Sequence, residues 1–455
     1  MAVISNRSVA LPPLGVNLVG TVLAIAIVVM FIAPRTALAT LAIVAFLPFL
    51  SGALRRRCEV SLVPPPLVVA CGFLAVYVLA SAAWSAAPLL AIYTAAIGLL
   101  ILALAWVAVA GIELLSPLRA QKLSNAVAIG FAIGLAFLFV EELTNDAVKL
   151  FFYKNLPFIT RNPKHMVLRD TEVVTLAFYL SNRSMAIASL LLWPVLGLLA
   201  VLFAAPSHKP LRTLFVLGLS AMASATVLMS QHETSAIALA AGAVAFATAM
   251  IWRRLAFGMV IAGWACAILF VIPMAHFAYD TLLLQKSQSL PFSAKARIVL
   301  WKYTATLIPH APIIGVGANS TEVLDLRRGA VPALPDEPAP LRTARHAHNI
   351  YLQVWYELGV IGAALLALIG ASAAGAMRRL SGSVQPYALA TFATSAAMAA
   401  TSWSLWQEWF LAAFAMAAVF IWLNECLKRG AATVMAQSPK LGLDRIPLSP
   451  AAVSQ

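Results

Sequence analysis

The stretch PLLAIYTAAIGLLILALAWVAVA, residues 88–110, has no charged side chain and is long enough to cross the hydrocarbon core of a membrane as one helix. Similar apolar runs recur along the whole chain. Of its 455 residues, 62% are hydrophobic and 11% are charged, which is too little charge to cover a soluble globule of this size. The alternation of a barrel strand is absent, and backbone groups in lipid need internal partners. The sequence therefore predicts an all-α polytopic membrane protein.

We expect about twelve transmembrane helices, because twelve apolar runs are separated by basic clusters or by Pro, Gly and Ser. The predicted spans are 16–33, 36–54, 63–83, 88–110, 124–142, 185–205, 213–229, 235–252, 255–275, 352–376, 384–402 and 409–425. The first run is too long for the core of a typical signal peptide and lacks a clear cleavage site, so we interpret it as a span.

Basic residues in the short connections set the predicted orientation. Every basic cluster follows an even-numbered span: Arg55–Arg57, Arg119 and Lys122, Lys209 and Arg212, Arg253 and Arg254, Arg378 and Arg379, and Lys428 and Arg429. On the other side the short connections hold almost nothing basic, and Arg35 is the exception. Lys and Arg favour the cytoplasmic side, so both termini are predicted to be cytoplasmic.

This topology divides the chain into blocks. Spans one to five lie in residues 1–142, six to nine in 185–275 and ten to twelve in 352–430, and we expect a disordered cytoplasmic tail over 431–455. Two long connections, 143–184 and 276–351, face outward with helical segments of their own. Both are rich in Lys and Arg against the usual bias. This excess favours a specific anion site, with contact to anionic lipid headgroups as the alternative.

Residues 293–362 hold the most informative pattern. Residues 293–308 predict a helix with Arg297 and Trp301 one turn apart on one face. A sharp turn, Pro312-x-x-Gly315-x-Gly317, follows it. The chain then enters the tenth span through His346-Ala347-His348-Asn349 and continues to Glu357-x-Gly359-x-x-Gly362. The outer connection Ser230–Glu233 is interpreted as structural, because adjacent His and Glu side chains do not face each other on a helix.

In this order the motifs of residues 297–362 resemble the signature of the O-antigen ligase and polymerase superfamily. Trp84-Ser85-x-x-Pro88 and Asn182-Arg183-Ser184 resemble it as well. The resemblance implies a glycosyltransferase of the bacterial inner membrane with its active site on the periplasmic face. Its reaction would pass a glycan from undecaprenyl diphosphate to a hydroxyl of an acceptor.

The resemblance also implies roles for individual residues. His348 is the candidate general base, and Arg183 and Arg297 are candidates to hold the diphosphate. The alternatives are a histidine that caps the next span and arginines that reach toward headgroups. Further candidates for substrate binding are Lys302, Arg161, His346 and Asn349. His346 and His348 could not face one site if the helix had already begun, since two residues turn about 200°.

We expect an O-antigen ligase, with an undecaprenyl-diphosphate-linked glycan as donor and lipid A-core as acceptor. The basic outer loops suit a phosphorylated lipopolysaccharide. Membrane lipids are further partners, and neither nucleic acid nor a cofactor is expected. No Asp-x-Asp occurs, which disfavours a metal site, and a single base predicts inversion at the anomeric carbon.

Three alternatives stay open. An O-antigen polymerase and a protein O-oligosaccharyltransferase share the motifs of the superfamily. A twelve-span secondary transporter is disfavoured, because the interiors of the spans lack ionisable residues and the long connections are unequally placed.

Overall fold

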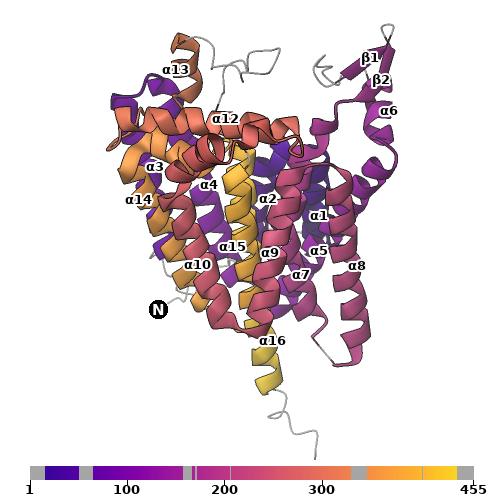
Figure 1. Cartoon of the computed structure of the whole chain (residues 1–455). Helices are drawn as coiled ribbons and strands as arrows, with labels where there is room; N and C mark the ends of the chain where they lie inside the picture. The colour runs from indigo at the N-terminus through magenta and orange to yellow at the C-terminus, as the bar shows by residue number, and fades with distance from the viewer. Residues whose placement is uncertain are drawn as a thin grey trace, which may run out of the picture.

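The computed structural model describes residues 16–50, 65–156, 166–169, 172–204, 206–328, 346–401 and 403–437. Arg161 and residues 438–455 of the predicted tail lie outside these ranges. The described chain is a bundle of long helices with shorter elements gathered at one end (Figure 1).

Among the residues that the structure describes, eight helices are long and apolar enough to cross a membrane. They contain α3 (Pro66–Ala80), α4 (Pro88–Glu113), α5 (Pro117–Leu143), α7 (Asn182–Leu202), α8 (Lys209–Met229), α9 (Glu233–Ile251), α14 (Ile350–Arg378) and α16 (Glu408–Gln437). A ninth candidate is α10 (Arg253–Leu269) together with α11 (Val271–His276) and the π-helical turn Phe277–Thr281, which bend by 71° at their junction. The chain is a multi-pass integral membrane protein.

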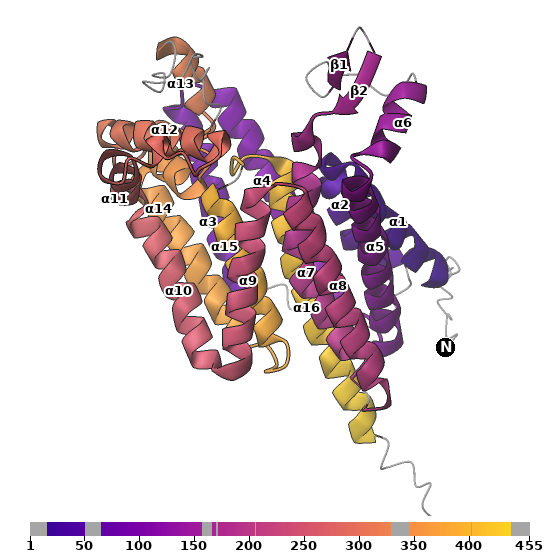
Figure 2. The same cartoon turned by 45° about the vertical axis from the view of Figure 1, so that its right-hand side comes forward.

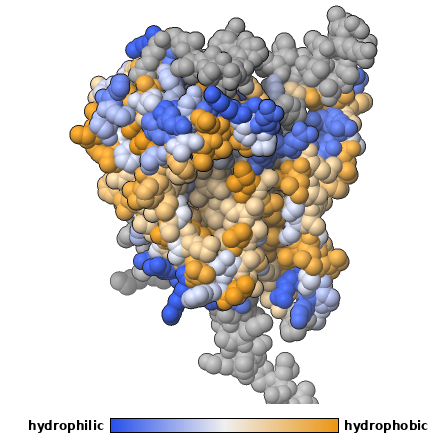
Figure 3. Space-filling view, in the orientation of Figure 1, coloured by the Kyte–Doolittle hydropathy of each residue, from blue (hydrophilic) through white to orange (hydrophobic). Residues whose placement is uncertain are grey.

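The remaining predicted spans correspond to α1 (Val16–Ile32), α2 (Ala37–Leu50) and α15 (Gln385–Thr401). These helices have at most 17 residues, whereas each of the eight candidate spans has at least 18, with α3 continued to Ala83, so the count of twelve spans stays a prediction. In Figure 3 an apolar band of surface lies between hydrophilic residues at both ends of the bundle, as a lipid environment requires.

Proline begins several of the long helices. Pro66, Pro88, Pro117 and Pro210 occupy the first or second helical position, where the missing N–H would have no partner anyway. Proline therefore fixes where these helices start, and the apolar run that follows fixes their length.

Close helix packing rests on small residues. Gly134 of α5 lies against α1, where an added Cβ would be 2.6 Å from the ring of Phe31. Gly242 of α9 lies against Trp193 of α7, whose indole N–H donates to Thr394 of α15 at 2.9 Å. Helix α7 is central: it packs against α16, α15, α5 and α8, and most of its side chains are buried.

The elements outside the spans lie together at one end. They are α6 (Ala147–Asn155), α12 (Phe292–Leu307) and α13 (Thr321–Arg328), with the strands β1 (Met166–Arg169) and β2 (Glu172–Leu176) (Figure 1). Helix α12 lies across the end of the bundle in both cartoon views (Figure 2). Both long connections therefore contribute to the same end.

The spans are helical as predicted, and the described part of the first long connection adds one short hairpin. Strands β1 and β2 pair antiparallel, with Met166 opposite Leu176 and an irregularity between Val167 and Leu168. Valine and threonine favour strands, and a segment outside the lipid core is not limited to helix.

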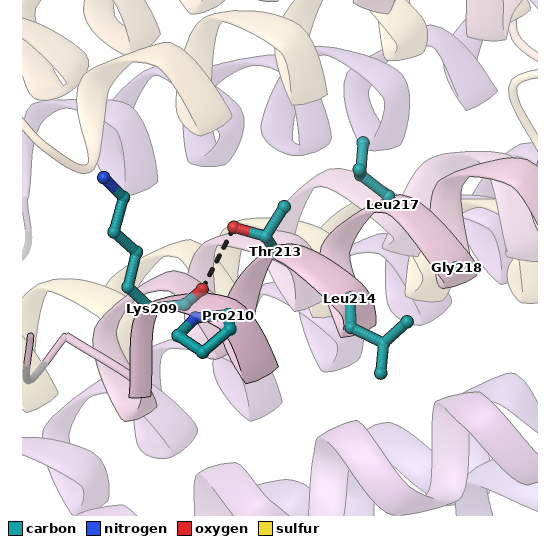
Figure 4. Close-up of a pocket in the computed structure, with 6 residues that line it drawn as sticks. All are labelled: Lys209, Pro210, Thr213, Leu214, Leu217 and Gly218. Carbon is teal, nitrogen blue, oxygen red and sulfur yellow. Dashed lines mark hydrogen bonds between the residues drawn. The ribbon is translucent and has the colours of Figure 1, made fainter. Parts of the chain in front are cut away.

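The opposite end holds the starts of α8 and α10 and the end of α16 (Figure 1). A surface depression of about 590 Å³ lies there, against Lys209, Pro210, Thr213, Leu214, Leu217 and Gly218 (Figure 4). In it the hydroxyl of Thr213 donates to the carbonyl of Lys209 at 3.0 Å, an ordinary helical contact. This depression is remote from α12 and carries no candidate chemistry.

The predicted sidedness can be tested by cysteine labelling in a background that lacks the four native cysteines. Gln288 and Ser207 are both exposed, beside α12 and at the start of α8 respectively. We expect a membrane-impermeant maleimide to label Gln288→Cys in intact spheroplasts and Ser207→Cys only after permeabilisation. The reverse pattern would contradict the topology.

Candidate functional site

Helix α14 is broken near its outer end. Gly359 has φ 63° and ψ −160°, which interrupts the helical ladder. The turn at residues 312–317 fills the break: the N–H of Val360 donates to Pro312 at 2.9 Å, and the N–H of Gly317 donates to the carbonyl of Glu357, also at 2.9 Å. Backbone groups freed by the break thus find partners in the turn.

Two glycines make this contact possible. A Cβ on Gly359 would lie 2.3 Å from the carbonyl oxygen of Ile313, and one on Gly315 would lie 2.3 Å from the backbone of Glu357. Both glycines have positive φ. The interpretation of the 312–317 motif as a sharp turn is confirmed, and its glycines serve the scaffold.

The carboxylate of Glu357 is buried at the same place. One oxygen accepts from the hydroxyl of Thr321 and, at 3.3 Å, from the amide of Gln353. The other accepts from the N–H of Asn319 at 2.8 Å and from the indole of Trp406. Glu357 therefore ties three segments together: α14, the residues before α13, and the α15–α16 connection.

The motif that begins with Trp84 is part of this scaffold. The hydroxyl of Ser81 accepts from the N–H of Ala318 at 3.0 Å, and the hydroxyls of Ser85 and Ser320 lie 2.7 Å apart. The outer corner between α3 and α4 thus holds the residues that follow the turn through side-chain hydrogen bonds.

His346, His348 and Asn349 immediately precede α14. Asn349 is its N-cap, with the side-chain oxygen accepting from the N–H of Leu352 at 3.1 Å. The N–H of His348 donates to Nδ1 of His346 at 3.1 Å, and the two ring centroids are 4.1 Å apart. His346 is buried, and His348 is half-buried with φ 52°, a sparsely populated conformation for a non-glycine residue.

This geometry settles how the two histidines relate. Helix α14 begins at Ile350, after both of them, so the helical argument against a shared site does not apply. Because Nδ1 of His346 accepts a hydrogen bond, a neutral His346 carries its proton on Nε2. The tight turn holds the two imidazoles together.

Arg183 lies in the first turn of α7 beside an aromatic cluster, which we define as His232, Trp403 and Trp409. Its guanidinium carbon is 5.7 Å from the centre of the Trp409 ring. The rings of Trp409 and Trp403 are 4.8 Å apart, and those of Trp403 and His232 are 5.4 Å apart.

Arg297, on α12, acts on the other end of this cluster. Burial, and then the charge of Arg297, lower the pKa of His232 to about 3. Burial also lowers the pKa of Arg297 itself, opposed by the charge of Glu233. Arg183 and Arg297, from the two long connections, therefore act on opposite ends of the aromatic cluster: Arg183 lies over Trp409, and the charge of Arg297 acts on His232. That they hold a diphosphate stays a prediction.

The interpretation of Ser230–Glu233 as a purely structural connection missed this proximity. His232 is buried, with Nδ1 2.7 Å from the hydroxyl of Ser235, and Glu233 accepts from Ser293 of α12 at 3.2 Å. The available signal was a short polar run on the predicted outer side, and only the tertiary fold shows that α12 docks on it.

The α15–α16 connection joins the cluster to α14. Gln353 donates to the hydroxyl of Ser404 at 2.9 Å and accepts from the N–H of Leu405 at 3.1 Å. Ser404 follows Trp403 directly, and Gln353 is one turn inside the helix that Asn349 caps. The histidine turn and the aromatic cluster are thus held to one another.

Two further candidates are placed differently. Lys302 forms an ion pair with Asp280 and donates to Nδ1 of His276 at 2.7 Å, so its charge is already matched. Arg161 lies outside the described residues. Within the described ranges no group of three His, Cys, Asp or Glu side chains is placed to hold a metal ion.

The fold and site define a multi-pass membrane protein with arginines, paired histidines and aromatic rings gathered at one end of its bundle. Residues 217–367 match the family model described as O-antigen ligase, so the resemblance of the motifs at residues 297–362 to that family is confirmed. The matched range includes His232, Arg297, His348 and Glu357 but not Arg183.

Curated relatives agree with this family. The chain is 22% identical over 294 residues to a "Putative polysaccharide ligase" of Rickettsia felis. It is 24% identical over 295 residues to a protein of the same name from Rickettsia bellii. In both cases the alignment spans 64% of this chain and 64% of the relative.

The close backbone contact between α14 and the turn at residues 312–317 predicts that alanine substitutions at two glycines differ in their effect on stability. Gly359→Ala should destabilise the protein by about 3 kcal/mol or more, because of positive φ and overlap with Ile313. Gly375→Ala, in the same helix with open space around it, should not. Thermal unfolding of the purified variants in detergent measures this, and equal melting temperatures would contradict this contact.

The lowered pKa of His232 predicts acid sensitivity. The folded protein keeps this imidazole neutral, whereas the unfolded chain protonates it below about pH 6.5. Its contribution to stability is therefore complete above pH 6.5 and is lost as pH falls toward 3, by up to about 1.4 kcal/mol per pH unit. Between pH 7.5 and pH 5, the melting temperature should fall less for His232→Gln than for wild type. His208→Gln, at the opposite end, should keep the wild-type drop, and an unchanged drop in His232→Gln would refute the assignment.

Proposed function

We propose that this protein is an O-antigen ligase of the bacterial inner membrane with its active site on the periplasmic face. It would transfer a glycan from undecaprenyl diphosphate to a sugar hydroxyl of lipid A-core. The observation that carries the proposal is that one aromatic cluster at the end of the bundle has Arg183 over Trp409, lies within the electrostatic influence of Arg297 and is linked to the histidine turn through Gln353 and Ser404. The O-antigen ligase domain over residues 217–367 supports the same assignment.

His348 is the better base of the available histidines. General-base catalysis works best when the pKa of the base lies near the working pH. His232, with a pKa of about 3, is too weak a base for that role, and its ring packs against Trp403. His348 is half-buried, and its left-handed backbone is fixed by the ring of His346.

In the proposed reaction, His348 takes the proton of the acceptor hydroxyl as that oxygen attacks the anomeric carbon. The new C–O bond forms while the bond from the anomeric carbon to the diphosphate oxygen breaks. Undecaprenyl diphosphate departs as an anion, and this single displacement inverts the anomeric centre.

Arg183 and Arg297 would stabilise the departing diphosphate. A guanidinium stays charged and offers a planar fork of donors to phosphate oxygens. Both side chains are half-buried, which strengthens their attraction for an anion relative to open water. Their donors supply the neutralisation that a divalent cation gives in other glycosyltransferases, so we propose a metal-independent reaction.

Transfer assays with purified enzyme, lipid-linked donor and lipid A-core test these roles. His348→Ala should lose about 10²–10⁴ in rate while still binding donor, because only the base is missing. Arg183→Lys and Arg297→Lys keep the charge but lose the fork, so activity should fall in both. Arg379→Ala, at the opposite end, is the control and should keep wild-type activity.

Near-normal transfer by His348→Ala would refute the role of His348 as general base. Loss of wild-type transfer activity in the presence of a chelator would refute the metal-independent reaction. A deletion strain separates ligase from polymerase. Accumulation of long lipid-linked glycan supports the ligase, whereas accumulation of single lipid-linked repeat units supports the polymerase.

A further inference from the structure

Arg35 is the one basic residue in a short connection on the predicted outer side, against the usual distribution of charge. It lies in the single helical turn Pro34–Thr36 that joins α1 to α2. Helix α1 runs toward the end of the bundle that carries α6 and α12 (Figure 2). Nothing in the proposed reaction yet uses this residue.

The fold brings this turn to the site. Residues 34–36 pack against both α7 and α16, the helices that begin with Asn182 and Glu408. Arg183 lies in the first turn of α7 and stacks on Trp409, in the first turn of α16. The charge of Arg35 repels that of Arg183, which places the two guanidinium groups within electrostatic reach of each other.

Two acids of this region have hydrogen-bond partners other than the two arginines. Asp146 accepts from Lys149 at 2.9 Å and from the hydroxyl of Ser181 at 3.3 Å. Glu408, beside Trp409, accepts from the hydroxyl of Tyr93 at 3.1 Å. Among the described residues no ion pair involves Arg35 or Arg183. Two like charges thus lie near each other, and neither has an ion-pair partner among the described residues, so an anion between them would be attracted by both.

We propose that Arg35 is a substrate-binding residue, which forms with Arg183 and the edge of the aromatic cluster a site for a phosphate group of a lipid-linked substrate. This rests on the proposed role of Arg183 in binding phosphate. Two arginines can engage two phosphate groups, or opposite sides of one. The donor diphosphate and a phosphorylated acceptor both present this chemistry.

Direct binding tests the proposal without requiring turnover. Protein in detergent is titrated with unglycosylated undecaprenyl diphosphate and, separately, with phosphorylated lipid A-core, at two salt concentrations. Arg35→Ala should weaken one of them by about tenfold at low salt, the loss of one partly exposed charge-assisted contact. Arg35→Lys should recover part of it. The matched control is Arg254→Ala, an exposed arginine at the start of α10, at the opposite end.

The two substrate arms identify the source of the phosphate. Weaker binding of undecaprenyl diphosphate alone assigns the site to the donor, and weaker binding of lipid A-core alone assigns it to the acceptor. In the double variant Arg35→Ala/Arg183→Ala, a shared phosphate predicts non-additive losses. Unchanged affinity for both ligands in Arg35→Ala, at wild-type melting temperature, overturns the proposal.

Failure of the ligase function would look different. If wild-type protein binds undecaprenyl diphosphate through Arg35 and Arg183 but transfers no glycan, the anion site is supported and the proposed reaction is refuted. If Arg183→Ala loses both binding and transfer while Arg35→Ala keeps both, only the role of Arg35 is refuted.

Discussion

The outer half of this protein depends on one buried carboxylate. Glu357 is 1% exposed, and its two oxygens accept from four donors that belong to three separate segments. A buried carboxylate without donors costs several kcal/mol, so separation of any of these segments is opposed by a large penalty. The requirement to satisfy Glu357 therefore holds the 319–321 segment and the α15–α16 connection against α14.

The arrangement of the candidate site follows from this constraint. Trp406 and Gln353 both donate hydrogen bonds to Glu357, and Gln353 also donates to Ser404. Because Trp403 directly precedes Ser404, it cannot move independently of the start of α14. The histidine turn lies directly before that start, and Trp403 contacts His232 and Trp409. Catalytic geometry on a loop needs such a rigid support, since small misplacements cost large factors in rate.

The sequence predicted those features that rest on local composition. Apolar length alone placed α4, which extends from Pro88 to Glu113 where a span at 88–110 was expected. It could not separate twelve spans from eight or nine, because helices such as α2 are shorter than a full crossing and α10–α11 is bent. The hairpin escaped prediction because its short strands lie outside the lipid, where helix is not obligatory.

Features of the site that rest on tertiary contact were out of reach. Motif order selected His348, Arg183 and Arg297, but it could not show that both histidines precede the helix or that Lys302 is matched by Asp280. The docking of α12 on the α8–α9 connection, which brings Arg297 to His232, joins residues that are far apart in sequence. Patterns of spacing within one helix carry no information on such contacts.

The excess of positive charge at this end also has a physical consequence. Arg183 and Arg297 are half-buried. Among the described residues, burial lowers the pKa of Arg297 and the negative charge of Glu233 raises it. Holding unneutralised guanidinium groups at a membrane boundary costs free energy, and an anion that enters recovers it. Burial, and then the charge of Arg297, keep His232 neutral, so the attraction for a bound phosphate comes from the arginines. An aromatic ring can attract a guanidinium over its face without supplying a counter-charge that would compete with a substrate. An end of the bundle built from arginine and aromatic rings is therefore suited to bind an anion strongly and, once the anion departs, to remain folded without it.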